Sequence, residues 1–299
     1  MTGESDVFDS VAPADDSVSG RSSRVIYGWS YFAPIALFYA VFLIAPYAAV
    51  LVVSFRRFSS ATLYTSTYTF DNYLSVLTDR FYLSLLLGTI ALGVAVTLLT
   101  LVLGYPLALR IVRSTPRMKA ILLAIALSPL LINLVVRTYA WLVLLGDHGI
   151  VNNWLMALSV ISSPLPISGN VVSVTIGLVH VALPLMILSL VGIMERIDPD
   201  LLDAAESLGA APLRILRRVH FPLALPGVGA GSLLVFCFTI SAFVTPQLLG
   251  GHRYSTIATV IFEKFTFSLN WPLGAALVFV LLALNFAVIL LHGRIFREA

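Results

Sequence analysis

Six long apolar runs occupy most of the 299-residue sequence and limit its fold more than any other feature. Crossing about 30 Å of hydrocarbon takes a helix of about 20 residues, and each run reaches that length. Backbone groups in lipid must satisfy one another, so these runs are expected to be helical. The sequence therefore predicts six transmembrane helices, within residues 27–55, 81–109, 120–145, 171–194, 222–249 and 272–292.

The low charge content and the polar N-terminal segment indicate the fold class and the domain boundaries. Only 11% of the residues are charged, against about 25% in soluble domains, so we predict an all-α integral membrane protein. Residues 1–24 lack the basic start and short apolar core of a secretory signal, and we expect a disordered cytoplasmic tail. Residues 25–80 are expected to hold the first transmembrane helix and an external loop, and residues 81–295 the main transmembrane domain.

The basic residues predict the orientation. One set of helix flanks holds twelve Lys and Arg residues and the other holds five, with Arg137 left inside a helix. Cytoplasmic loops are enriched in Lys and Arg, so both termini are predicted to be cytoplasmic. Arg137 lies late in an outward-running helix, where it can extend toward the outer interface. We expect a structural anchor there, with contact to the solute as the alternative.

The loop between the fourth and fifth runs, residues 195–222, has a local pattern of its own. Asp198 and Pro199 are typical of a helix start, with an acidic cap and a proline in the first turn. Ala204 and Ala205 give this helix a small face, and Gly209 is expected to end it. A second short amphipathic helix follows. The pattern predicts a helix–turn–helix that fits a groove on a cytoplasmic partner.

The same loop carries a family resemblance. It reads Asp203-Ala204-Ala205, three residues, Gly209, nine residues, then Val219-His220-Phe221-Pro222. This spacing resembles the EAA loop of binding-protein-dependent ABC importer permeases, with Asp for Glu, Val for Ile and Phe for Leu. The shorter Asp leaves open whether it reaches a partner as Glu does. The resemblance implies a type I ABC importer permease fold, with five helices in the core and the first outside. It also implies an ATPase-coupling site at Asp203, Ala204, Ala205, Glu206, Gly209, Val219 and Pro222.

Further segments resemble spermidine/putrescine-type permeases. They are residues 137–146, 149–154 and 243–251 and the pair Trp271-Pro272. Residues 70–73, before the second predicted helix, resemble a segment that is common across binding-protein-dependent permeases. The resemblance implies ATP-driven import of a polyamine such as spermidine or putrescine, or of a related amine. Permeases for iron, phosphonates, opines and 4-aminobutyrate look similar, so these solutes remain alternatives.

The resemblance also implies partners. They are two ATP-binding subunits, a second permease subunit that is expected to be a paralogue, and an extracytoplasmic solute-binding protein, all at a bacterial inner membrane. No nucleic-acid partner is expected. Neither Lys119 nor Lys264, the two lysines, follows a P-loop pattern. The chain is therefore expected to be no enzyme and to bind no cofactor itself, while the partner ATPase uses ATP and Mg.

Few polar residues lie within the predicted helices. The candidate pathway-lining residues are Asn133, His180, Thr239, Ser241 and Asn285, although hydrogen bonds between helices would explain them as well. No two histidines have metal-ligand spacing, so no metal site is predicted. No Asp or Glu lies deep in a span, which argues against the alternative of an ion-coupled secondary carrier. Small residues at 227–231 predict a close helix contact, either with a second permease or within this chain.

Overall fold

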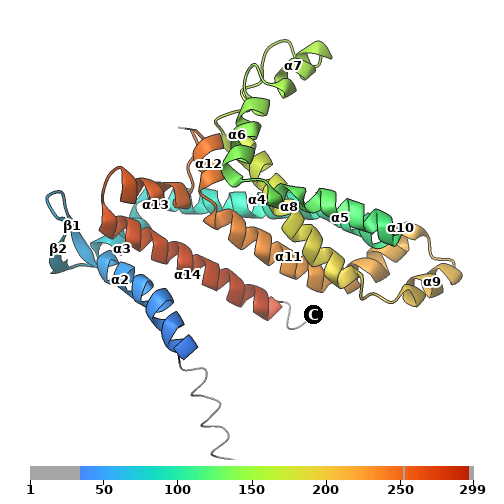
Figure 1. Cartoon of the computed structure of the whole chain (residues 1–299), viewed down its shortest axis with the longest axis horizontal. Helices are drawn as coiled ribbons and strands as arrows, with labels where there is room; N and C mark the ends of the chain where they lie inside the picture. The colour runs from blue at the N-terminus through green and yellow to red at the C-terminus, as the bar shows by residue number, and fades with distance from the viewer. Residues whose placement is uncertain (1–33, 252, 296–299) are drawn as a thin grey trace, which may run out of the picture. The chain divides into compact units, whose positions relative to one another are not determined.

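The computed structural model describes residues 34–251 and 253–295 (Figure 1). Six helices in this part of the chain are long and apolar enough to cross a membrane: Pro34–Ser54, Arg80–Val112, Leu134–Ala157, Val171–Met194, Pro212–Ser241 and Trp271–Arg294. The predicted number of transmembrane helices is therefore confirmed. The predicted tail, residues 1–24, and the start of the first predicted helix lie outside the described residues.

The chain divides after Val50 into two units. The described part of the first unit is helical and contains a π-helical segment, η1 (Ala40–Ile44), followed by α2 (Ala45–Ser54), which runs into the second unit. The prediction that the first helix packs outside the other five concerns the placement of one unit against the other, and it stays a prediction.

The second unit is built almost entirely of helices (Figure 1). In chain order its elements are β1 (Arg56–Ser59), β2 (Leu63–Tyr68), α3 (Asp71–Thr78), α4 (Arg80–Val112), α5 (Pro116–Leu131), α6 (Leu134–Leu145), α7 (Ile150–Ala157), α8 (Val171–Met194), α9 (Pro199–Ser207), α10 (Pro212–Ile215), η2 (Leu216–His220), α11 (Phe221–Ser241), α12 (Val244–Leu249), α13 (Ile257–Thr266) and α14 (Trp271–Ile295).

A two-stranded antiparallel hairpin, β1–β2, lies in the loop after the first span and was not predicted. Arg56 fastens it, because its guanidinium donates to the Ser66 carbonyl at 2.6 Å and to the Tyr68 hydroxyl at 3.0 Å. Asn72 then donates its side-chain amide to the carbonyls of Ser54 and Arg56, both at 2.9 Å. The segment at 70–73 therefore holds the end of the first span to the hairpin.

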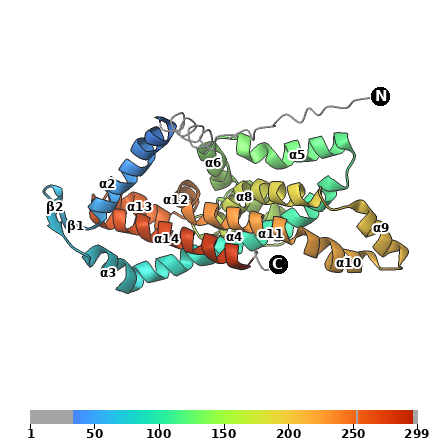
Figure 2. The ribbon, with the colours of Figure 1, turned by 90° about the horizontal axis from the view of Figure 1, so that it is seen from below.

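Three helices, α4, α8 and α11, form the core and lie side by side in Figures 1 and 2. Glycines permit the close approach. A Cβ added at Gly104 would lie 3.1 Å from Met186 Cγ, one at Gly227 would lie 3.0 Å from Ile193 Cβ, and one at Gly231 would lie 2.7 Å from Met186 Sδ. The small-residue face at 227–231 thus packs on α8 of the same chain, which is the second of the two alternatives stated above.

The prediction of one helix over residues 120–145 is wrong. The helix stops at Leu131 and restarts at Leu134, and the candidate span is Leu134–Ala157. Asn133 causes the restart, since its side chain accepts from the backbone N–H of Val135 at 2.9 Å and so caps the new helix.

Arg137 connects the two halves of this broken segment. Its side chain is only 7% exposed, and Nη1 donates to the carbonyl of Pro129 near the end of α5. The last carbonyls of a helix have no partner within the helix, so this bond satisfies one of them. Arg137 therefore anchors the break, as a structural role predicts.

Two π-helical turns accommodate prolines within long helices. The turns η1 and η2 each end two residues before a proline, Pro46 and Pro222. A proline cannot donate to the carbonyl four residues earlier, and its ring clashes with that carbonyl. In a π turn the bonds join residues five apart, as when the Phe221 N–H donates to the Leu216 carbonyl. The helix continues through Pro222 as a result.

The fifth span is displaced from the predicted range of 222–249 at both ends. It runs without interruption from Pro212 to Ser241, so the second helix of the preceding loop is continuous with the span. It ends because Ala242 is extended, with φ −68° and ψ 131°. Pro246 then falls in the first turn of α12, where a missing N–H leaves no hydrogen bond unmade.

Candidate functional site

The loop over residues 195–222 forms the predicted helix–turn–helix. Asp198 caps α9 by accepting from the backbone N–H of Asp200 at 3.0 Å, and Pro199 occupies the first turn. The predicted helix start is confirmed. At the base of the loop, Lys119 and Glu195 form an ion pair between the start of α5 and the end of α8.

Gly209 ends α9 in the left-handed region, with φ +78°. Its N–H donates to the Glu206 carbonyl at 2.8 Å, and the Ala210 N–H donates to the Ala205 carbonyl at 3.1 Å. These two bonds define a Schellman motif, for which glycine is the preferred residue. A Cβ added at Gly209 would meet nothing within 4 Å. The conformation, and not crowding within this chain, accounts for glycine here.

The surface of the loop exposes apolar side chains from both of its helices. No residue of α9 is buried, and the side chains of Leu201, Leu208 and Leu213 are 51%, 88% and 59% exposed. Ala204 is exposed and Ala205 is half-buried, so the small face predicted for this helix is accessible at least in part. The loop thus offers both exposed apolar side chains and a small helix face to a partner.

A hollow of about 310 Å³ lies behind the loop. The end of α4 contributes Arg113 to its lining, and the loop contributes Leu202, Asp203, Glu206, Ala210, Pro212 and Ile215. The two carboxylates and the guanidinium therefore border the same space, which favours the loop electrostatically in its present position.

Val219 and Pro222, the last predicted coupling residues, lie in η2 and in the first turn of α11. His220 lies between them, is 2% exposed, and shares a 2.9 Å hydrogen bond with the Tyr105 hydroxyl of α4. This contact was not predicted, because the two residues are 115 positions apart. It joins the π turn to the core.

The five candidate pathway-lining residues do not converge on one site. His180 accepts at Nδ1 from Trp141 Nε1 at 3.1 Å, and Asn285 donates to the Leu281 carbonyl of its own helix at 3.0 Å. Both polar groups therefore have partners within the fold. Whether either lines a pathway stays a prediction.

The other three candidates differ in exposure. Asn133 is exposed and caps α6, as described above. Ser241 is exposed at the end of α11, whereas Thr239 is fully buried and its hydroxyl has no hydrogen-bond partner among the described residues. Ser241 is thus the candidate most accessible from the end of α11.

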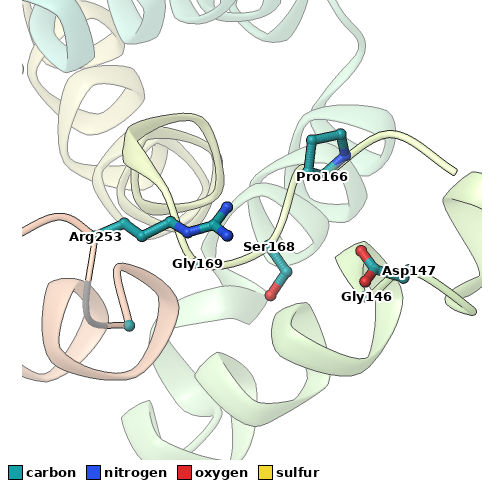
Figure 3. Close-up of a pocket in the computed structure, with 7 residues that line it drawn as sticks. Gly146, Asp147, Pro166, Ser168, Gly169 and Arg253 are labelled. Carbon is teal, nitrogen blue, oxygen red and sulfur yellow. The ribbon is translucent and has the colours of Figure 1, made fainter.

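At the end of α11 away from the coupling loop, two adjoining hollows open beside α12 and α13. We call the first, of about 460 Å³, the Asp147 hollow; its lining residues are Gly146, Asp147, Pro166, Ser168, Gly169, Gly251 and Arg253. Figure 3 shows Arg253 extending toward Ser168 and Gly169, with Asp147 on the other side. This hollow thus contains one acidic and one basic side chain.

We call the second, of about 320 Å³, the Glu263 hollow; its lining residues are Pro246, Gln247, Gly251, Tyr254, Ser255, Thr259, Glu263 and Phe267. The two hollows share Gly251. The Tyr254 hydroxyl donates to the Gly88 carbonyl at 3.3 Å, and burial raises the pKa of this hydroxyl. The ring is therefore neutral and held in position.

Within residues 34–251 and 253–295, no three His, Cys, Asp or Glu side chains are grouped so that they could hold a metal ion. Two other features of this part of the chain remain as candidates: the exposed loop at one end of α11 and the polar hollows at the other.

Comparison with known proteins identifies this arrangement. Residues 101–298 match the family described as "Binding-protein-dependent transport system inner membrane component". The spermidine/putrescine transport system permease protein PotB of Haemophilus influenzae is 33% identical over 270 residues, covering 90% of this chain and 91% of that protein. PotB of Escherichia coli is 33% identical over 257 residues, covering 86% and 93%.

Solved structures show the same fold. A bacterial ABC transporter involved in the import of the acidic polysaccharide alginate matches with a TM-score of 0.70 and 14% identity, covering 93% of this chain and 97% of that chain. The same transporter in complex with an alginate pentasaccharide-bound periplasmic protein matches with a TM-score of 0.71, covering 94% and 97%. The chain therefore belongs to the family of binding-protein-dependent transport system inner membrane components, and it is the permease subunit of an ABC importer.

Proposed function

We propose that this subunit imports a small polyamine, such as spermidine or putrescine, or a related amine. The observation that carries the proposal is the 33% identity to spermidine/putrescine permeases over about nine-tenths of the chain. The alginate importer supports the fold alone, because its identity is 14%. Iron, phosphonate, opine and 4-aminobutyrate are the competing solutes.

In this proposal the loop at 195–222 lies in the cytoplasm and docks on one of two ATP-binding subunits. Its exposed Leu201, Leu208 and Leu213 supply the apolar contact. ATP and Mg belong to those subunits, and this chain binds no cofactor. Movement of the docked loop passes into α11 directly, because the helix is continuous from Pro212 to Ser241.

The remaining partners follow from the same assignment. A second permease subunit, which we take to be a paralogue, completes the pathway, and an extracytoplasmic binding protein delivers the solute. The Lys and Arg bias supports cytoplasmic termini and a multi-pass position in a bacterial inner membrane. No carboxylate lies deep in a span to select a cation, so the binding protein determines most of the selectivity.

Reconstitution in proteoliposomes tests the proposal. The complex is assembled with ATP inside the vesicles and binding protein outside, and uptake of labelled spermidine is measured. Uptake should require both ATP and the binding protein, and it should persist with a protonophore. Omitting the binding protein should abolish uptake and leave the complex assembled.

Two results would contradict the proposal. Uptake driven by an ion gradient without ATP would indicate a secondary carrier. ATP-driven uptake of a phosphonate or of iron, with none of any amine, would refute the assignment of the solute.

A further inference from the structure

We propose that the Glu263 hollow binds the ammonium groups of the solute, with Glu263 as the ionic partner and Tyr254 and Phe267 as aromatic contacts. The proposal rests on the proposed function, because it states where an imported amine is held on this subunit. The candidate pathway-lining residues predicted from the sequence do not include this site, since α13 lies between the fifth and sixth spans.

The hollow has two walls of different origin. Thr259 and Glu263 are four residues apart, so they lie along one face of α13, and Phe267 follows at the C-cap of this helix. Pro246 and Gln247 of α12 form the other wall. A volume of about 320 Å³ is at the lower end of the range for small-molecule sites, about 300–1,000 Å³. The space therefore suits a small, linear solute.

The charge of the hollow favours a cation. Glu263 is exposed, and within the described part of the chain its carboxylate has no ion-pair partner. Lys264 follows directly, but its Cβ lies 3.3 Å from a Cβ added at Gly274 of α14, and Lys264 does not line the hollow. Among the described lining residues, Glu263 carries a negative charge, which attracts an amine and repels an anionic solute such as a phosphonate.

A row of aromatic rings begins at Phe267, which lines the same hollow as Glu263. Phe267 is 71% exposed, and its ring centroid lies 6.1 Å from that of Phe262, which stacks on Phe243 at 5.2 Å. An ammonium group within about 6 Å of an aromatic centroid is attracted to the ring face, and methylene groups pack on the same rings. A polyamine alternates these two chemistries, so it matches this row of side chains.

The neighbouring Asp147 hollow is less suited to an amine. Arg253 lines it together with Asp147, and its guanidinium opposes the approach of a cation. Among the lining residues that the structure describes, none in the Glu263 hollow is basic. The difference in charge between two adjacent hollows is the reason for assigning the amine to one of them.

The position of the hollow fits transport. Residues of α12 line it, and α12 lies at the end of α11 opposite α9 and α10 (Figure 1). Gln247 is six residues beyond Ser241, the last residue of the continuous helix from Pro212. A movement of the loop is thus transmitted along the helix from Pro212 to Ser241. We expect it to reach α12 across the extended residue Ala242 and to change the contacts of this wall with the solute.

Substitution of Glu263 tests the site in the assembled complex. Glu263→Gln should lower kcat/KM for spermidine uptake about two- to fivefold, the effect of losing one solvent-exposed charge pair. Glu263→Asp keeps the charge and should retain most of the uptake. Lys264→Gln is the matched control, because it removes a neighbouring charge outside the hollow, and it should transport as the wild type does.

A labelling assay gives a readout that a purely structural role would not alter. Ser255 lines the hollow, and Ser255→Cys is introduced with Cys237→Ala. Spermidine should slow the reaction of the new thiol with an impermeant maleimide, and Glu263→Gln should remove this protection. If Glu263→Gln fails to co-purify with its partners, Glu263→Asp and the labelling assay with Glu263 intact still test whether the Glu263 hollow binds the amine.

The outcomes separate this inference from the proposed function. Wild-type uptake by Glu263→Gln, or a thiol that spermidine does not protect, overturns the inference and leaves amine import standing. A complex that imports no amine refutes the proposed function instead. If its solute is an anion, Glu263→Gln should increase uptake.

Discussion

Gly209→Val is expected to separate the subunit from its ATPase while leaving it inserted in the membrane. Gly209 has φ +78°, and a left-handed conformation costs a non-glycine residue about 1–2 kcal/mol. A Cβ at this position meets nothing within 4 Å, so this chain adds no clash. The strain alone shifts the population of the docking conformation by a factor of about 5–30. Relaxation of the strain would break the bonds that Gly209 and Ala210 donate to α9.

Co-purification of the ATPase and uptake in proteoliposomes measure the effect. Gly209→Val should lose both, and steric exclusion from the partner groove would add to the backbone strain. Gly209→Asn is the matched control, because asparagine adopts the left-handed region more readily, and it should retain more of both. Asp203→Ala should also retain part of both, since an exposed charge pair contributes about 0–1 kcal/mol.

Two results would refute this reasoning. Wild-type transport by Gly209→Val with the ATPase still bound would show that the loop is only a linker. If Gly209→Asn and Gly209→Val lose ATPase binding and uptake equally, the size of the side chain at the partner surface causes the loss. The left-handed backbone conformation would then not be its cause.

Two further predictions concern packing and topology. Gly227→Ala should destabilise the protein by about 1–3 kcal/mol through overpacking against α8. Gly192→Ala should not, because a Cβ added there meets nothing within 4 Å. Thermal unfolding in detergent compares the two variants, and equal melting temperatures would contradict the packing argument. With Cys237→Ala as background, an impermeant thiol reagent should label Ser163→Cys and not Ser114→Cys in intact cells, and the reverse pattern would overturn the predicted orientation.

The sequence was sufficient to predict the helices but not their ends. Apolar length determines how many segments can cross a bilayer, and that count holds in the structure. The ends depend on single polar residues and prolines. Asn133 follows an apolar run and is a typical N-cap, so the break after Leu131 had a local signal. Pro222 resembles a helix start, yet the π turn before it lets the helix pass through.

The two functional regions differ in how local their signals are. Asp198 and Gly209 act within α9, as cap and as C-terminal turn, so the shape of the coupling loop can be predicted from its own sequence. The Glu263 hollow joins α12 and α13, and the contact of Tyr105 with His220 joins residues 115 apart. Such contacts depend on helix packing. The spacing of Thr259, Glu263 and Phe267 was the one signal in the sequence.

The length and charge of the helix from Pro212 to Ser241 locate the membrane boundary. Its 30 residues span about 45 Å, more than the hydrocarbon thickness of about 30 Å. The 21 residues of α11 alone span about 31 Å, and all the arginines of the helix precede them, at 214, 217 and 218. Arginine is costly within lipid, so the boundary lies near Phe221. The π turn and its bond to Tyr105 therefore lie at the point where the helix enters the membrane, between the loop at 195–222 and the span that we propose it moves.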